Sequence, residues 1–343
     1  GAGDAGSLPN NYPGFQPVTD PANRAKFELA YGREMDQEKG ITKVTAFEVA
    51  GQGIRAMLID GENTVLSDPD SEMVRKGLDA LDHLVVIDIF PTETTELAHV
   101  VLPATAWGET EGTYTNTERR VQRVRAAVQP QGESKPDWWI IAQLAKRLGF
   151  RGFDWSGPDE VFDEYCELSP IYFGMDWERI SSGQGLQWPV PEKGHPGTHR
   201  LHEESFPNGR GIFQLVTYRD PAEMISDEFP VWLTTGRRLE SYHTRTQTGR
   251  AEGIDYLLPE EVLEVHPEDV EAWGLEAGGF AQMSSRRGSV RIKIQANDRS
   301  PRGTVFASFA FSDVPVNVLT GGGYDPVTHT AELKVCPVRL EPE

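Results

Sequence analysis

Two polar segments of this chain concentrate the side chains from which a ligand site could be built. The first, LPATAWGETEGTYTNTERRVQRVR, covers residues 102–125 and combines threonines, an asparagine and arginines with glycines. Its arginines can pair with Glu109, Glu111 and Glu118 in an ordinary surface network. Arginines left without such a partner can receive phosphate, which the planar guanidinium fits well. The residues alone leave both interpretations open.

The second segment, LTTGRRLESYHTRTQTGR at residues 233–250, directly follows an apolar stretch. It gathers hydroxyl, main-chain and cationic donors in one loop, and that composition suits a phosphorylated or heterocyclic ligand. Gly236 has no Cβ and would let a ligand approach the backbone closely. The alternative is a polar hairpin loop that binds nothing.

Other kinds of site find little support in the sequence. No Walker loop, HExxH or GxSxG motif occurs. His195, His199 and His202 form a local cluster in a Gly/Pro-rich loop, which we interpret as a solvated loop in preference to a metal site. Cys166 and Cys336 are the two cysteines; without a CxxC motif they indicate buried free thiols, since a cysteine-ligated cluster or zinc ribbon cannot be built from them alone.

The composition is that of a well-solvated, acidic protein. Mean hydropathy is -0.46, and 53 acidic residues against 33 basic ones give a net charge of -20. This charge argues against nucleic-acid or anionic-membrane binding, because both need a positive surface. No apolar run approaches the roughly 20 residues that cross a bilayer. The start, GAGDAGSLPNNYPG, has no signal-peptide character and no Met, so we expect a cytoplasmic location and a processed, split or truncated chain.

The elements that must position the polar segments follow from the hydrophobic pattern. Three apolar runs predict buried strands, and helical spacing after the first predicts a helix with Ser67 or Asp68 as its cap and Pro69 in its first turn. Strand–helix–strand order with short links is typical of a doubly wound parallel α/β sheet, which binds ligands beyond the carboxyl ends of its strands. The predicted strands are 54–60, 84–90 and 99–103, with a short helix at 92–98.

The last third of the chain has a different pattern. Short strands separated by turns begin near residue 211 and predict a closed or nearly closed β-barrel of about 110 residues. In the SRRGS turn, Gly288 stands where φ > 0 is tolerated. The predicted strands are 211–218, 231–235, 280–294 and 303–311, and helices are predicted at 21–31, 137–148 and 266–274.

The two polar segments together resemble the molybdopterin oxidoreductases, the family that includes formate dehydrogenases and periplasmic nitrate reductases. The segment at 102–124 resembles a family signature, and LTTGRRLESYHTRTQTGR is similar to the segment that opens the family's dinucleotide-binding barrel. Residues 284–311 and 317–341 resemble the rest of that barrel. The stretch DAGSLPNNYPGFQPVTDP is similar to formate dehydrogenase large subunits.

The resemblance implies a fold and a function. It implies a partial doubly wound α/β region at 1–225 and a double-psi β-barrel that binds molybdopterin dinucleotide at 226–343. The complete enzyme would interconvert formate and carbon dioxide, using two molybdopterin guanine dinucleotides (bis-MGD) around molybdenum or tungsten. The alternatives are another reaction of the family, such as nitrate reduction, and a non-catalytic cofactor-binding or assembly module.

The family's catalytic groups match nothing in this chain. Its metal-ligating cysteine or selenocysteine, its catalytic His and Arg, and its [4Fe–4S] cluster are expected on an N-terminal segment or subunit that acts as a partner. We therefore expect no catalytic and no metal-ligating residue here, and no activity of the isolated chain. Electron-transfer subunits are further expected partners.

Cofactor contacts are carried over from the family residue by residue. Asn63 follows the first strand, Asp88 ends the second, and Asp137 stands where a carboxylate pairs with the guanine edge. In the barrel loop, Arg237 and His243 are implied to approach the pterin and the pyrophosphate. Ala310 and Leu333 depart from residues usual in the family, which puts local polar contacts in doubt. The implied contact residues are Asn63, Ile87, Asp88, Thr110, Asp137, Thr235, Gly236, Arg237, Arg238, Leu239, Glu240, Ser241, Tyr242, His243, Thr244, Phe309, Asn317 and Lys334.

Overall fold

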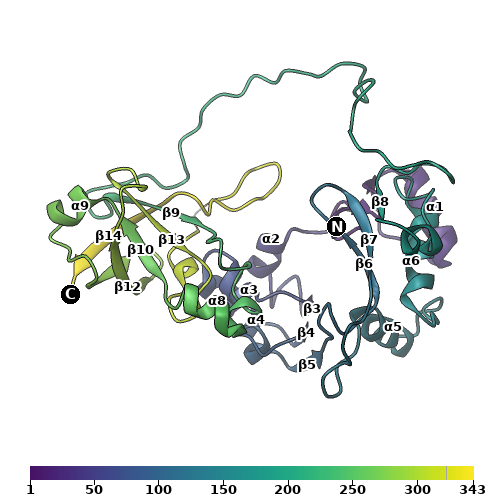
Figure 1. The fold of residues 1–343 in the computed structure, drawn as a ribbon, viewed down its shortest axis with the longest axis horizontal. Coiled ribbons are helices and arrows are strands. Elements are labelled where there is room, and N and C mark those ends of the chain that lie inside the picture. Colours follow the sequence, from purple (N-terminus) through teal and green to yellow (C-terminus); the bar gives the residue numbers. More distant parts are fainter. Residues whose placement is uncertain (322) are drawn as a thin grey trace. The chain divides into compact units, whose positions relative to one another are not determined.

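The computed structural model describes residues 1–321 and 323–343, and their internal contacts form two compact units (Figure 1). The first unit comprises residues 1–42 and 102–215, and the second comprises 43–101 and 216–343. The second unit thus joins the predicted strand–helix–strand segment to the barrel. The domain division at residues 225 and 226, which follows the chain linearly, stays a prediction.

A three-stranded sheet carries the first predicted set of strands. Strands β3 and β4 are parallel, with Ala56 opposite His83 and Asp60 opposite Ile87. Helix α4 connects them, and its Val74 and Leu78 are fully buried in the core of this region. The predicted strand–helix–strand arrangement is confirmed. The sheet has the order β3 (Ala56–Asp60), β4 (His83–Asp88), β5 (Val100–Pro103), with helices α2 (Lys43–Glu48), α3 (Thr64–Ser67) and α4 (Ser71–Asp79) beside it in sequence.

The start of α4 was predicted wrongly. Asp70 is its cap and accepts a 3.1 Å hydrogen bond from the main-chain nitrogen of Met73. Ser67 instead ends the short helix α3, and Asp68 after it is extended, so the chain straightens before α4 begins. The predicted helix at 92–98 is only a 3-10 turn, Thr95–Leu97. Thr92 holds that turn, since its hydroxyl accepts from the main chain of Thr95 and its carbonyl accepts from the Thr95 hydroxyl.

Six strands of the second unit close into a barrel, as predicted (Figure 1). Two neighbouring pairs, β10–β12 and β9–β13, are parallel, and the other four are antiparallel. Alternate side chains such as Leu233, Leu263 and Ile292 are fully buried in its core. The order around the barrel is β10 (Val262–Val265), β12 (Ser289–Ala296), β11 (Phe280–Ser284), β14 (Cys336–Pro342), β9 (Val231–Gly236), β13 (Thr304–Ser308), with α8 (Glu252–Leu257), α9 (Pro267–Ala272) and two 3-10 turns (Thr248–Arg250, Val316–Val318) between strands.

The hairpin of β11 and β12 is confirmed, but its glycine has a different role from the predicted one. Gly288 is absent from the residues with positive φ. A Cβ on Gly288 would lie 2.4 Å from Cγ1 of Val318. Close packing, and not backbone conformation, is what requires a glycine at this turn.

The strand predicted at 211–218 does not form. These residues have no regular structure, and the side chains of Ile212, Phe213, Leu215 and Val216 are exposed. Strand formation needs a neighbouring strand to satisfy the main chain, and the described structure gives this segment none. The apolar alternation of these residues predicted a strand for which no partner is present.

The first unit packs helices against a small antiparallel sheet. Its core includes Val121, Phe162, Tyr172 and Ile180, all nearly inaccessible. Helix α1 begins and ends as predicted, with Asp20 as its cap. None of the helices in the described part of the chain has the length and apolar character that a membrane crossing needs. The elements are β1 (Asn11–Tyr12), β2 (Gln16–Pro17), α1 (Pro21–Tyr31), β6 (Gly112–Thr115), β7 (Arg120–Val124), α5 (Asp137–Arg147), α6 (Pro158–Leu168), α7 (Trp177–Ser181) and β8 (Leu186–Gln187).

Candidate functional site

The loop that carries most predicted contacts leaves the barrel at the end of β9. Val231, Leu233 and Thr235 are buried, and the strand ends at Gly236. A Cβ on Gly236 would lie 2.6 Å from Cε2 of Phe306, because the neighbouring strand β13 brings that ring against the backbone. The glycine is therefore needed for packing inside the protein itself, which is a different reason from the ligand approach that we predicted.

Two basic side chains contact Phe309 after β9, and a third is bonded to the end of that strand. The guanidinium of Arg237 lies 5.8 Å from the centroid of the Phe309 ring, and the ring of His243 meets the same ring edge-on at 5.7 Å. Lys334 donates a 2.7 Å hydrogen bond to the main-chain oxygen of Thr235. We call Arg237, His243 and Lys334 the basic cluster.

The positive charge of Arg237 disfavours protonation of the other two members of the basic cluster. Burial, and then the charge of Arg237, lower the pKa of both His243 and Lys334. Lys43 lowers the pKa of His243 further, and Glu62 opposes this, although Glu62 is itself paired with Lys43 at 2.5 Å. Among the described ion pairs, none joins Arg237, His243 or Lys334 to a carboxylate. In a chain of net charge -20, such a cluster is suited to an anionic group.

A cavity of about 230 Å³ lies in the second unit, where the loops after β3 and β4 meet the barrel loops. This is the carboxyl end of the parallel strands, where open α/β sheets bind ligands. Of the predicted residues, Asn63 and Thr244 line it. The other lining residues are Leu66, Pro91, Thr92, Glu93, Arg245, Thr246, Gly249, Arg250, Ala310, Phe311, Ser312 and Asp313.

Residues at the ends of β3 and β4 are fixed by internal bonds. The amide of Asn63 donates to Glu93 at 2.6 Å and accepts from the Thr94 hydroxyl at 2.9 Å. Asp88 accepts from the main-chain nitrogen of Ile89 at 2.7 Å, and burial raises its pKa. Ile87 is fully buried, and its main-chain oxygen accepts from the nitrogen of Gly61 at 2.8 Å.

Two arginines that we did not predict stand in the cavity wall. Arg245 pairs with Asp255 at 2.5 Å and lies 4.2 Å from the centroid of the Phe311 ring. Arg250 lies 4.4 Å from the Phe90 centroid and donates to the carbonyl of Pro91 at 3.2 Å. The sequence did contain a signal for them, because the polar run continues to Arg250, whereas the predicted contacts stop at Thr244.

The remaining predicted residues of the second unit fall into two groups. Arg238 and Asn317 are buried and bonded inside the protein: Arg238 to Glu261 and Glu264, and Asn317 to the carbonyls of α3 at 2.9 and 3.0 Å. Leu239 and Tyr242 are 98% and 73% exposed, and Glu240 is half-buried. Ser241 is buried, yet its hydroxyl has no hydrogen-bond partner among the described residues. Exposed apolar groups and a free hydroxyl on one loop are typical of a binding surface.

Thr110 and Asp137 belong to the first unit, where each is half-buried. Asp137 is the first residue of α5, and acidic residues are favoured in the first turn of a helix. Thr110 precedes the hairpin of β6 and β7, and its hydroxyl donates to the carbonyl of Glu111 at 3.3 Å.

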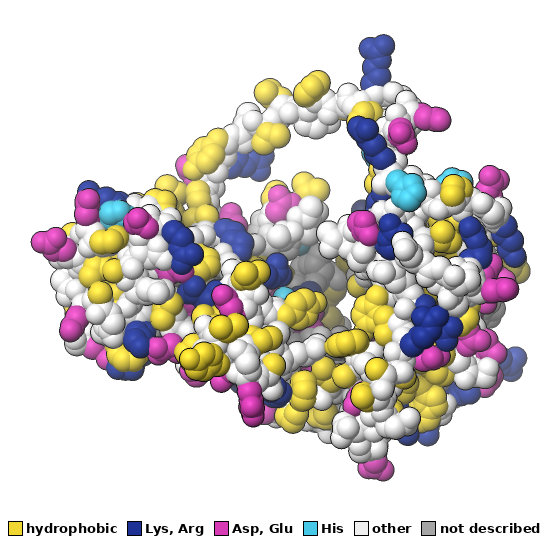
Figure 2. Space-filling model, in the orientation of Figure 1, with side chains coloured by type: hydrophobic (Ala, Val, Ile, Leu, Met, Phe, Trp, Pro, Cys, Tyr) yellow, Lys and Arg dark blue, Asp and Glu magenta, His cyan; other side chains and the backbone are white. Residues whose placement is uncertain are grey.

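The arginines of the 102–125 segment form the ordinary network that we considered. Arg120 pairs with Glu118 at 2.9 Å and Arg123 with Glu111 at 3.2 Å. Arg119 and Arg125 donate to main-chain carbonyls at 3.1 and 3.0 Å. Each of these four arginines therefore has a partner within the first unit. Figure 2 likewise shows acidic and basic side chains interspersed over the visible face.

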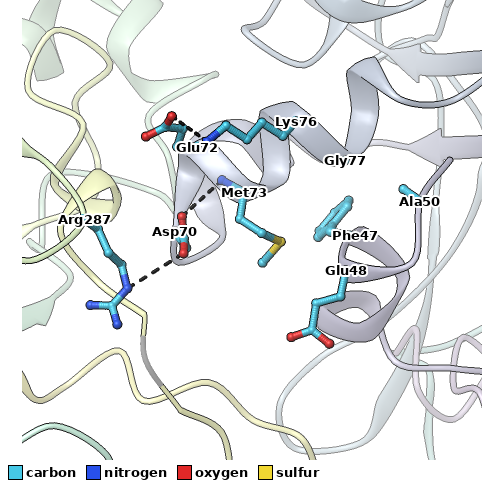
Figure 3. A pocket seen from close by; sticks show the side chains of 9 residues that line it. All are labelled: Phe47, Glu48, Ala50, Asp70, Glu72, Met73, Lys76, Gly77 and Arg287. Atoms are coloured by element: carbon cyan, nitrogen blue, oxygen red, sulfur yellow. Dashed lines mark hydrogen bonds and ion pairs between the residues drawn. The ribbon is translucent and has the colours of Figure 1, made fainter. Parts of the chain in front are cut away.

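A second cavity, of about 490 Å³, contains none of the predicted residues (Figure 3). Phe47 and Met73 give it an apolar side, and Arg287 stands across from them beside Asp70. Its cationic groups are already matched, since Lys76 pairs with Glu72 at 2.8 Å and Arg287 pairs with Glu223. This cavity lacks the unmatched positive charge that marks the basic cluster.

The cysteines and the histidine loop show no arrangement for a metal. Both Cys166 and Cys336 are buried and free, as predicted. His199 contacts the Gln187 side chain at 2.6 Å, and His195 accepts from the main chain of Gly197 at 3.2 Å. Within residues 1–321 and 323–343, no group of three or more His, Cys, Asp or Glu side chains is placed to hold a metal ion.

Comparison with known families gives two matches. Residues 3–147 match molybdopterin oxidoreductase, and residues 231–337 match the Molydopterin dinucleotide binding domain. The second match covers β9, the loop after it, the basic cluster and the start of β14.

Comparison with individual proteins agrees. The chain is 41% identical to the F420-dependent formate dehydrogenase 2 subunit alpha of Methanococcus maripaludis (99% of this chain, 51% of the relative). It is 34% identical to formate dehydrogenase H of Escherichia coli (100% and 49%) and 32% identical to the assimilatory nitrate reductase catalytic subunit of Bacillus subtilis (100% and 50%). It therefore spans about half the length of these curated relatives.

A solved structure has a similar fold. Acetylene hydratase from Pelobacter acetylenicus matches with a TM-score of 0.70 over 95% of this chain and 50% of that chain. Sequence identity is 19%, so this likeness concerns the fold alone.

Proposed function

Because this chain belongs to the molybdopterin oxidoreductase family, we propose that it binds molybdopterin guanine dinucleotide as the C-terminal, cofactor-holding part of a formate dehydrogenase large subunit. The observation that carries the cofactor-binding role is the basic cluster at the exit of β9. The relatives named formate dehydrogenase support formate as the substrate. The assimilatory nitrate reductase relative makes nitrate reduction the alternative.

The residues of the site fit this cofactor. A guanine dinucleotide carries a pyrophosphate, which needs positive charge and N–H donors. Arg237 and Lys334 supply that charge, and His243, whose pKa is lowered, supplies a ring N–H; none of the three has a carboxylate partner in the described ion pairs. The free, buried hydroxyl of Ser241 supplies a donor on the same loop. The ring of Phe309 gives the cluster an apolar side against which a heterocycle can pack.

Different residues would hold different parts of the cofactor. In the second unit, we assign the pyrophosphate of a nucleotide to the basic cluster. Considered by itself, the first unit offers the carboxylate of Asp137 to a guanine edge, which has adjacent N–H donors. Asn63 and Thr244 line the cavity where polar groups of the cofactor would bind, and Asp88 ends strand β4. When bound, the cofactor supplies the molybdenum or tungsten centre that takes up the two electrons of formate oxidation. The side chains described here bind and orient it.

We further propose that the chemistry depends on residues outside this chain. An N-terminal segment or subunit would carry the [4Fe–4S] cluster and the catalytic groups, and electron-transfer subunits would accept the electrons. The isolated chain is then inactive, and the complete enzyme works in the cytoplasm.

The test is to purify the complete enzyme and measure formate-dependent and nitrate-dependent turnover with an artificial electron carrier. The molybdopterin nucleotide is quantified by the guanine nucleotide that acid releases from it. We expect formate oxidation and bound nucleotide. Nitrate turnover without formate oxidation would overturn the assigned reaction, and a protein free of pterin would indicate a non-catalytic module.

A further inference from the structure

We propose that Arg238, Glu261 and Glu264 are positioning residues, which form a buried ionic network that holds the cofactor-binding loop in place. Family resemblance put Arg238 among the residues that touch the cofactor. The structure assigns its guanidinium to the interior of the protein instead. The inference rests on the proposed function for the identity of the ligand; the network itself is a feature of the barrel.

Both terminal nitrogens of Arg238 are held by acceptors, whereas its Nε has no hydrogen-bond partner among the described residues. Its side chain is 10% exposed; it donates to Glu264 at 2.8 Å, to Glu261 at 3.1 Å and to the carbonyl of Val262 at 2.8 Å. Its guanidinium also lies 5.4 Å from the centroid of the Phe306 ring. Two carboxylates and one carbonyl at these distances fix both the position and the plane of the guanidinium.

Glu261 connects the network to a second predicted contact segment. Its side chain is fully buried and accepts from the main-chain nitrogen of Ser308 at 3.0 Å and from the Ser308 hydroxyl. Ser308 ends β13, and its hydroxyl also accepts from the main chain of Ala310 at 3.3 Å. The residue between them is Phe309, which contacts Arg237 and His243 of the basic cluster. The Glu261 carboxylate thus connects Arg238 of the loop after β9 to the segment Ser308–Ala310, which contains Phe309.

Glu264 anchors the other end of the network in strand β10. It accepts from Arg238, from Arg299 at 3.1 Å and from the Asn297 amide at 3.1 Å. Its side chain is 7% exposed. These partners lie at the end of β12 and in the turn that follows, so the anchor is part of the barrel frame.

Adjacent arginines therefore have opposite roles. Arg238 contacts two buried carboxylates, whereas Arg237 is exposed and contacts Phe309 in the basic cluster. Both residues follow the end of β9 at Gly236. Fixing the guanidinium of Arg238 restrains the main chain next to Arg237, and this lowers the entropy lost when a ligand binds.

The test uses the complete enzyme, produced both with the cofactor and in a host that cannot make it. Hydrogen–deuterium exchange of residues 237–244 and 308–310 is measured in the cofactor-free protein. Guanine nucleotide content is measured in the protein produced with the cofactor. The variants are Arg238→Met and the charge-neutral combination R238M/E261Q/E264Q. The combination guards against misfolding, because Arg238→Met alone leaves the buried carboxylate of Glu261 without a cation and leaves Glu264 with Arg299 as its one cation among the described ion pairs.

A matched control is available in the same barrel. Arg291 of β12 also pairs with a carboxylate, Glu343 at 2.9 Å, and also lies over an aromatic ring, Phe280 at 3.6 Å, but its side chain is 54% exposed. Arg291→Met should leave both exchange and nucleotide content unchanged. Arg237→Met should lower nucleotide content while exchange in the cofactor-free protein stays at the wild-type rate.

For Arg238→Met or the neutral combination we expect faster exchange in both segments. We also expect nucleotide content about tenfold lower, which is the smaller end of the effects known for residues that support a metal site's ligands. Protection in β11 and β12 should persist. Loss of nucleotide without faster exchange would make Arg238 a contact residue and overturn the proposal, as would an unchanged result in both measurements. If wild-type enzyme carries no pterin nucleotide, the proposed function fails, and the exchange measurement still decides on the network.

Discussion

The ammonium group of Lys334 donates a 2.7 Å hydrogen bond to the main-chain oxygen of Thr235, and the Thr235 hydroxyl donates back to the carbonyl of Leu333 at 2.5 Å. This reciprocal contact joins the end of β9 to the segment before β14. It also holds Lys334 near Arg237, whose charge lowers the pKa of Lys334. Like charges held together by the fold indicate a site prepared for an anion.

Removal of either cation should weaken cofactor binding. In the complete enzyme, Arg237→Met and Lys334→Met should each reduce bound guanine nucleotide by about tenfold, because hydrogen bonds to charged groups contribute roughly 1.5–3 kcal/mol. Lys293→Met is the control: Lys293 is a lysine of the same barrel that pairs with Glu260 at 2.5 Å. Equal retention in all three variants would remove the basic cluster from the binding site.

The titration of His243 provides a test that needs no cofactor. Burial and the charge of Arg237 lower its pKa, so NMR of the cofactor-free protein should show His243 titrating below the ordinary value of about 6.5. The unfolded chain binds a proton at His243 more readily than the folded protein does. The free energy of unfolding therefore falls as pH falls from the ordinary pKa of His243 toward its lowered pKa in the folded protein. Arg237→Met should raise the pKa of His243, and His243→Gln identifies its signal. A pKa at or above the ordinary value would contradict the geometry of the cluster.

The carboxylate of Asp137 should be needed for nucleotide retention. Asp137→Asn keeps the size of the side chain but replaces one acceptor oxygen with a donor, so the side chain can no longer accept from both adjacent N–H donors of a guanine edge. As a first-turn acid of α5, Asp137 also interacts favourably with the helix dipole, by about 0.3–1 kcal/mol. We expect less bound guanine nucleotide in the folded enzyme. Wild-type content of nucleotide and metal would dismiss the guanine assignment.

Periodicity and capping residues predicted the elements that carry their own signals. Helix α1 follows Asp20 and has Pro21 in its first turn, and it lies where the spacing placed it. The barrel strands alternate between buried and exposed side chains, so their existence could be derived locally. The segment 211–218 shows the limit of this reasoning: its apolar alternation is strand-like, but a strand needs a partner that local sequence does not specify.

The residue types of the site were predictable from the sequence. Which of these residues face the binding surface and which are bonded inside the protein was not. The sequence shows Arg237 and Arg238 side by side and gives no reason to separate them. Only the fold reveals that Glu261 and Glu264 receive the second one. Arg245 and Arg250 were missed because their place in the cavity wall depends on Phe311 and Phe90, which are distant in sequence.

The packing role of Gly288 can be checked by adding one methyl group. A Cβ there would meet Val318 at 2.4 Å, so Gly288→Ala should destabilise the barrel by about 1–3 kcal/mol, as overpacked cores do. Gly253→Ala in α8 is the matched control, since nothing lies within 4 Å of its Cβ position. The double variant G288A/V318A should recover most of the loss in urea denaturation. A stability loss that survives in the double variant would mean that Val318 is not the obstacle.

The two thiols should be unreactive until the protein unfolds. Burial raises the pKa of Cys336 to about 11, and it also raises the pKa of Cys166. The thiolate is the reactive form, so at pH 8 about one molecule in a thousand has Cys336 ionised, given a tenfold change for each pH unit. A disulfide-exchange reagent should therefore detect almost no thiol in the native chain and both thiols in denaturant. Rapid labelling of either cysteine in the folded protein at pH 8 would contradict this prediction. For Cys336, it would show that the region around its hydrogen bond to the Leu319 carbonyl opens easily.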